Sequence, residues 1–100
     1  MLNLNDIRQC IEPILSDSPI YVVTVFGSFA RGTNHDNSDV DIIIDSRGEL
    51  KGIDFFIWAD KIAQTLPVKS DIFEAREIKV NSKLKSRIDR EGVVIYERTG

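Results

Sequence analysis

The sequence predicts an α/β (α+β) fold, a single domain in which a mixed β-sheet has helices packed on one face. The chain has 100 residues, of which 42% are hydrophobic and 29% charged, which is typical of one small globular domain covering residues 1–100. Apolar runs rich in β-branched residues alternate with segments whose apolar residues recur every three or four positions. No repeat or linker divides the chain, so the uncovered face of the sheet is where we expect a functional site.

The first half of the chain predicts a helix followed by two strands. Apolar residues at helical spacing indicate an amphipathic helix that begins near Asn5, and Pro13 should end or kink it near its last turn. Residues 20–26 are almost continuously apolar and lie between a proline-containing turn and a glycine, which is typical of a buried strand. Residues 27–37 then predict a turn, a short helical piece and a loop, and residues 40–44 form the second strand.

A second helix is expected after the second strand, and it should end before Pro67. Its apolar positions are Ile53, Phe56, Ile57, Ala63 and Leu66. Phe55, Phe56 and Trp58 occupy three of four consecutive positions. Because such residues cannot all point to one side of a helix, at least one ring should be exposed and available to a partner.

The last third of the chain predicts a strand, a helix and a closing strand. Residues 68–73 form the third strand. Asn81 or Ser82 is the candidate N-cap of the final helix, and Gly92 follows its expected end. Residues 93–96 then form the closing strand.

Composition and charge exclude several classes of protein. Cys10 is the only cysteine, so neither an intramolecular disulfide nor a thiolate metal cluster can form, and a reducing, cytoplasmic setting is expected. No stretch approaches the ~18 apolar residues that span a bilayer, so we expect no membrane association. The net charge is −3, and the basic stretch near the C-terminus is interrupted by acidic residues and lacks interleaved aromatics. Direct nucleic-acid binding is therefore not expected.

Carboxylates gather on the second and third predicted strands. Asp39 and Asp41 share a face of the second strand, where like charges repel, and a hard divalent cation such as Mg²⁺ resolves that conflict. Asp71 lies on the same side of the sheet if the apolar residues of the third strand face the helices. Glu74 is close enough to Asp71 that a slip in strand register would exchange the two.

A glycine and a serine follow the first predicted strand directly. Gly27 lets the backbone approach phosphate oxygens, the hydroxyl of Ser28 can donate to them, and the amides of a helix start favour an anion. A phosphate-binding turn beside a pair of carboxylates is typical of nucleotide chemistry.

These motifs resemble the nucleotidyltransferase superfamily that includes DNA polymerase beta. The resemblance is carried by Gly27-Ser28-Phe29-Ala30-Arg31-Gly32, by Ser38-Asp39-Val40-Asp41-Ile42 and by Asp71. More narrowly, they are similar to the MNT-type minimal nucleotidyltransferases, the MntA-like antitoxins of HEPN/MNT toxin–antitoxin pairs. The motifs cover roughly residues 20–75, and residues 91–96 resemble the usual ending of that family.

The resemblance implies a nucleotidyltransferase fold that uses ATP as nucleotide donor and two Mg²⁺ ions. It assigns Asp39 and Asp41 as metal ligands. Asp71 would join the metal site and help to deprotonate the acceptor hydroxyl. Attack on the α-phosphorus would then be in line with the departing pyrophosphate.

The same resemblance assigns the remaining site residues and a partner. Gly27 and Ser28 would hold the phosphates of the donor, and Arg31 would support them. Family members of this size pair with a HEPN-type RNase toxin and transfer AMP to one of its tyrosines. A hetero-oligomer of this chain with such a toxin is therefore expected.

Two other functions remain open from the sequence. A non-catalytic antitoxin could neutralise its partner by binding and masking it, although masking needs none of Gly27, Asp41 or Asp71. A small-molecule nucleotidyltransferase would need a substrate-binding domain, and 100 residues leave room for one only in a second subunit.

Overall fold

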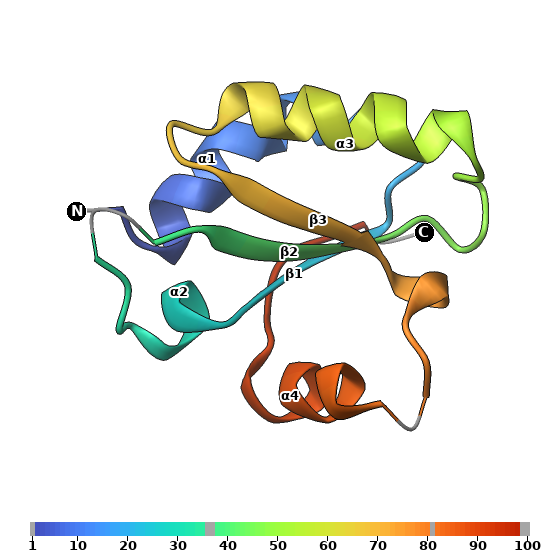
Figure 1. Ribbon diagram of the computed structural model, residues 1–100. Coiled ribbons are helices and arrows are strands. Elements are labelled where there is room, and N and C mark those ends of the chain that lie inside the picture. Colours follow the sequence, from blue (N-terminus) through green and yellow to red (C-terminus); the bar gives the residue numbers. More distant parts are fainter. Residues whose placement is uncertain (1, 36–37, 81, 99–100) are drawn as a thin grey trace.

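The computed structural model of the chain describes residues 2–35, 38–80 and 82–98 and confirms the predicted mixed α/β fold (Figure 1). The helices are α1 (Leu4–Leu15), α2 (Ser28–Arg31), α3 (Ile53–Thr65) and α4 (Lys83–Glu91), with a single 3₁₀ turn, η1 (Ala75–Glu77). The strands are β1 (Val22–Phe26), β2 (Val40–Asp45), β3 (Ser70–Glu74) and β4 (Val93–Glu97). No helix in the described part of the chain is long and apolar enough to cross a membrane.

The four strands form one mixed sheet in the order β3-β2-β1-β4. β1 pairs antiparallel with both β2 and β4, whereas β2 and β3 are parallel. Parallel neighbours need a long crossover, which α3 provides between β2 and β3. β3 is consequently an edge strand, with its outer side next to no other strand of this sheet.

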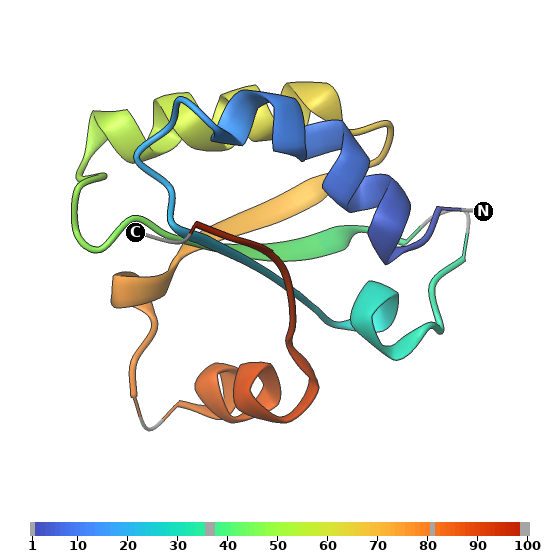
Figure 2. The ribbon, with the colours of Figure 1, turned by 180° about the vertical axis from the view of Figure 1, so that it is seen from behind.

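Helices α1 and α3 lie side by side over one face of the sheet, as both ribbon views show (Figures 1 and 2). The core between these helices and the sheet comes from alternate strand positions, since successive side chains of a strand point to opposite faces. Its fully buried members include Ile7, Ile11, Leu15, Val23, Val25, Val40, Ile42, Ile44 and Ile62. This face matches the one that the sequence assigns to the helices.

The expectation that all helices pack on one face is wrong for α4, which lies on the opposite side of the sheet (Figure 1). The reason is that this face is also apolar, because Phe26 is 2% exposed and Ile43 is 6% exposed there. Ile88 of α4 helps to line a small cavity with Thr24 and Ile43. The helix therefore covers one part of this face and leaves the end bearing the aspartates beside it.

The prediction of which apolar residues of α3 form its packed face is also wrong for part of the helix. Ile53 is 75% exposed, Phe56 68% and Ile57 47%, whereas Phe55, Trp58 and Ile62 pack against the core. α3 has two apolar stripes, and periodicity does not decide which of them meets the sheet. Exposure of Phe56 does confirm that one of the three clustered rings faces outward.

Helix ends follow the expected chemistry, with shifts of a residue or two. Asn3 caps α1 in a capping box with Asp6, and the helix continues past Pro13 to Leu15. Ser82 accepts the N-cap hydrogen bond of α4, while the alternative cap, Asn81, lies outside the described residues. The first strand begins at residue 22 instead of 20, and the third covers residues 70–74 instead of 68–73.

Candidate active site

Two of the three predicted carboxylates stand next to each other on parallel strands. Asp41 of β2 is in register with Asp71 of β3, and both point to the face opposite α1 and α3. Asp39 lies just before β2 and is exposed. Glu74 pairs in register with Ile44 and is buried on the other face of the strand. The structure therefore brings Asp71, and not Glu74, to the side of Asp41.

Gly27 lies close to Asp41, one member of this pair. It follows β1 directly and has a φ of +79°, in the region that favours glycine. A Cβ atom at this position would clash with Oδ2 of Asp41. Ser28 follows as the first residue of α2, and the amides of a first helical turn have no partners within the helix. The predicted phosphate-binding turn and the carboxylate pair thus form one continuous surface.

Burial and neighbouring charges shift the pKa of the Asp41 carboxyl. Partial burial is the main cause that raises the pKa of its carboxyl above the usual value, and the negative charges of Asp71 and Asp39 add to it. Arg87 and Arg31 act in the opposite direction and lower the pKa of Asp41. The net direction is upward, with burial as its largest cause. A cation bound beside Asp41 would lower this pKa, because an opposite charge favours the ionised carboxylate.

The donor set at this surface suits a hard cation. Carboxylate oxygens are ligands that Mg²⁺ prefers, and this ion is commonly held by one or two carboxylates together with substrate phosphates. Within residues 2–35, 38–80 and 82–98, no three His, Cys, Asp or Glu side chains are gathered into a complete metal site. Asp41 and Asp71 therefore fit Mg²⁺ that arrives with a nucleotide, whose phosphates supply further oxygens.

An ion-pair cluster of Arg31, Glu91 and Arg87 joins α2 to α4 beside the carboxylates. Nη1 of Arg31 is 3.0 Å from both carboxylate oxygens of Glu91, and Nε of Arg87 is 3.4 Å from Oε1. The hydrogen bond from Arg31 is the largest cause that lowers the pKa of Glu91. Arg31, predicted to support the phosphates, is thus paired with a carboxylate in this structure.

Arg87 is the residue of this region that sequence reasoning missed. Its guanidinium lies 5.8 Å from the ring centroid of Phe26, and its charge acts on Asp41 more strongly than that of Arg31. The basic stretch to which it belongs predicts only a solvated helix face. The one available signal is its spacing of four residues from Glu91, and that spacing does not show which side of α4 meets the sheet.

Comparison with known proteins places this geometry in context. The family described as "Polymerase beta, Nucleotidyltransferase" matches residues 9–99. A Methanocaldococcus jannaschii protein named "Putative protein adenylyltransferase MJ0435" is 31% identical over 93 residues, which span 92% of this chain and 97% of that protein. The Shewanella oneidensis protein named "Protein adenylyltransferase MntA" is 33% identical over 77 residues, 76% of this chain and 55% of that protein.

A solved structure shares the fold over nearly the whole chain. It is a crystal structure of a toxin–antitoxin complex with AMP-PNP, matched with a TM-score of 0.72 at 26% identity. The match covers 98% of this chain and 76% of the other.

Proposed function

The chain belongs to the polymerase beta nucleotidyltransferase family, and we propose that it transfers AMP from ATP to a tyrosine hydroxyl of a HEPN-type toxin, in a Mg²⁺-dependent reaction, as an antitoxin. The relatives named protein adenylyltransferase support a protein acceptor. The related toxin–antitoxin complex with AMP-PNP supports both an adenine nucleotide and a toxin partner.

One observation carries this proposal: Gly27 lies against Asp41, and Asp41 lies beside Asp71. A turn that can approach phosphates is thereby placed next to carboxylates that can hold a divalent cation. Neither a masking protein nor a structural module needs both features at one point of its surface.

Each residue of the site has a role in the proposed reaction. Asp39, Asp41 and Asp71 would hold Mg²⁺, which supplies charge neutralisation for the triphosphate when it is bound. Gly27 and Ser28 contact the phosphates and orient the donor. Asp71, exposed at the edge strand, accepts the proton of the acceptor hydroxyl as that oxygen attacks the α-phosphorus and pyrophosphate leaves.

The cation cluster offers a way to accommodate the negative charge of the donor. Arg31 and Arg87 both pair with Glu91. A guanidinium group binds a phosphate as readily as it binds a carboxylate. Arg31 therefore supports the phosphates, and Glu91 fixes its position near the Gly27 turn.

Transfer of label from ATP tests the proposal. We expect incubation of the chain with labelled ATP, Mg²⁺ and the cognate toxin to add AMP units to the toxin, measured as intact-mass shifts. Asp71→Asn should lower the rate by about 10² to 10⁴, as removal of a general base commonly does. Asp17→Asn, in the exposed loop after α1, is the matched control and should transfer at the wild-type rate.

Two outcomes would reject this function. Absence of transfer from any of the four nucleoside triphosphates to a verified toxin, with Mg²⁺ present, would favour neutralisation by masking. Transfer to a small molecule in preference to the toxin would favour the small-molecule nucleotidyltransferases that obtain a substrate domain from a second subunit.

A further inference from the structure

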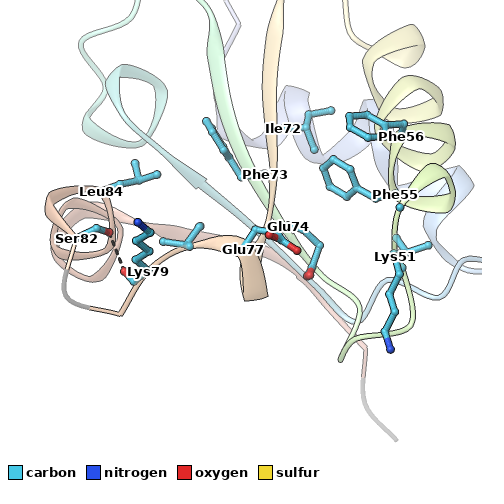
Figure 3. Close-up of a pocket in the computed structure, with 13 residues that line it drawn as sticks. Lys51, Phe55, Phe56, Ile72, Phe73, Glu74, Glu77, Lys79, Ser82 and Leu84 are labelled. Atoms are coloured by element: carbon cyan, nitrogen blue, oxygen red, sulfur yellow. Dashed lines mark hydrogen bonds between the residues drawn. The ribbon is translucent and has the colours of Figure 1, made fainter.

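A cavity lies away from the candidate active site, at the outer edge of β3. We refer to it as the β3-edge pocket. Its volume is about 610 Å³, within the range of about 300 to 1,000 Å³ that ligand pockets usually have. Figure 3 shows Phe55, Phe56 and Ile72 on one side of β3 and Phe73 and Leu84 on the other, with Glu74 between them. The pocket thus lies between α3 and α4 and has mainly apolar walls.

Glu74 gives this pocket an unsatisfied polar group. The residue is 6% exposed, and its Oε1 has no hydrogen-bond partner among the described residues. Oε2 accepts only a long hydrogen bond of 3.4 Å, from the backbone N–H of Arg76. The guanidinium of Arg76 itself lies against Gly48 and does not pair with Glu74. A buried acceptor without a donor destabilises the folded state, so a ligand that donates a hydrogen bond to this oxygen would be favoured.

The groove continues along the same strand beyond the pocket. A second hollow of about 350 Å³ shares Phe55, Phe56 and Ile72 with it and includes Ser70. Oγ of Ser70 is also buried and has no hydrogen-bond partner in the described part of the chain. Two exposed residues of α3 extend the apolar surface: Ile53, about one helical turn before Phe56, and Ile57, which directly follows it. An occupant that contacts all of these groups must be longer than a small molecule.

The charges that line the pocket favour a basic side chain at its buried end. Lys51, Lys79 and Glu77 are exposed at the rim, whereas Glu74 is buried, so Glu74 is the charge that an occupant meets inside the pocket. Glu74 requires a donor, and a donor that is charged gives the stronger bond. A basic side chain set in a polypeptide supplies this donor, and the apolar stem of lysine or arginine can lie along the aromatic walls.

We propose that the β3-edge pocket binds an arginine or lysine side chain, presented by an apolar segment of the protein that accepts the nucleotide, with its cationic head on Glu74. This inference rests on the proposed function, since it assigns the pocket to the protein acceptor. The pocket would hold the acceptor at the edge strand whose opposite face bears Asp71. It is separate from the residues that hold the nucleotide.

Titration of the ¹⁵N-labelled full chain with the peptide acetyl-Leu-Arg-Leu-amide, followed by NMR, tests the pocket directly. We expect saturable shifts of the amides of Phe55, Phe56 and Glu74. The neutral analogue with citrulline in place of arginine should produce none of them. Glu74→Gln, which keeps the shape of the side chain, should weaken binding about tenfold or more. Glu12→Gln makes the same chemical change at an exposed position of α1, outside the residues that line the pocket, and is the matched control.

Phe56→Ala provides a second variant whose fold is not at risk, because the ring is 68% exposed. This substitution should also weaken binding of the peptide. When the same variants are titrated against the cognate toxin, their affinities for the toxin should follow the same order as their affinities for the peptide. Equal binding by the wild type and Glu74→Gln, or no saturable shifts in the wild type, would overturn the proposal. So would arginine amide alone binding as tightly as the peptide, because the occupant would then be a small cation.

A separate titration with Mg²⁺ and ATP distinguishes this inference from the proposed function. Shifts around Gly27 and Asp41 report the nucleotide site. A wild-type chain that binds the peptide but no Mg²⁺-ATP would reject the proposed function and leave the pocket established. The reverse result would reject the pocket alone.

Discussion

Asp41 is a residue whose charge destabilises the fold but suits the proposed binding of a cation. Its carboxyl is partly buried and faces two further aspartates, so its pKa is raised. A group whose folded pKa is raised favours folding below its unfolded pKa, and this contribution is lost as the pH rises through the folded value. At neutral pH the folded chain therefore carries a charged group that it would be more stable without. Such a cost is expected where a carboxylate is kept to bind a cation.

Replacement of Asp41 by asparagine should stabilise the protein in the absence of metal. We expect Asp41→Asn to melt above the wild type at neutral pH in a chelator, with each kcal/mol recovered raising Tm by about 4 to 8 °C. The difference should vanish as the pH falls below 3.8, the ordinary pKa of this carboxyl, because the wild-type group is then neutral in both states. Calorimetry at both pH values measures it. A less stable asparagine variant at neutral pH would reveal a structural partner of this carboxylate.

Among the structural elements, the turn from β1 into α2 is the one that we propose to hold the nucleotide. Gly27 and Gly32 flank this four-residue helix, with φ values of +79° and +74°. The two glycines differ in their surroundings, because a Cβ on Gly27 would meet the carboxylate of Asp41, whereas a Cβ on Gly32 would have no described residue within 4 Å beyond its chain neighbours. Nucleotide affinity at the two positions therefore tests whether contact with Asp41 matters.

Alanine at these two positions should therefore give different results. Gly32→Ala forces the left-handed helical conformation on a residue with a side chain, at roughly 1 to 2 kcal/mol, whereas Gly27, with φ +79° and ψ −152°, has a conformation that is essentially restricted to glycine. Gly27→Ala should destabilise more than Gly32→Ala and should weaken Mg²⁺-ATP binding at least about tenfold, because the clash displaces Asp41. Denaturant unfolding and calorimetric titration of both variants provide the comparison. Equal losses of nucleotide affinity would mean that closeness to Asp41 is not what position 27 requires.

Helix α4 contributes to the site from far along the sequence. It brings Glu91 to Arg31, 60 residues away, and places Arg87 near Phe26 and Asp41. The helix covers only part of its face of the sheet, because Ile43 and Phe26 need an apolar cover while Asp41 and Asp71 need access. This arrangement leaves room for the proposed active site on a face that is partly apolar.

At the scale of the whole molecule, ligand binding should be visible as thermal stability. A ligand that binds only the folded state, at a hundredfold excess over its Kd, stabilises the protein by about 2.7 kcal/mol. For a domain of this size that corresponds to a rise in Tm of roughly 10 to 20 °C. We expect this rise for the wild type with Mg²⁺ and ATP together, measured by differential scanning fluorimetry, and little rise for Asp41→Asn.

Separate additions of Mg²⁺ and of ATP serve as controls, since the site is completed only by both. Equal shifts of the wild type and the variant would show that Asp41 does not hold the metal.

The sequence by itself determined the elements, the family and the order of the motifs. Alternation of residues along β2 and β3 is a local property, so it predicts that Asp41 and Asp71 can share a face, and the register of the two strands places them side by side. The family resemblance is confirmed by the match over residues 9–99. The roles of Asp39, Asp41, Asp71, Gly27, Ser28 and Arg31 remain predictions.

Only the tertiary structure decided which surfaces meet. Two apolar stripes of α3 fit helical periodicity, and the one with Trp58 and Ile62 is the one that packs against the core. The side of the sheet taken by α4 and its Glu91–Arg31 pair depend on contacts between distant residues, which local patterns do not encode. The unpartnered oxygen of Glu74 has the same origin, because burial and hydrogen bonding are properties of the packed chain and not of its sequence spacing.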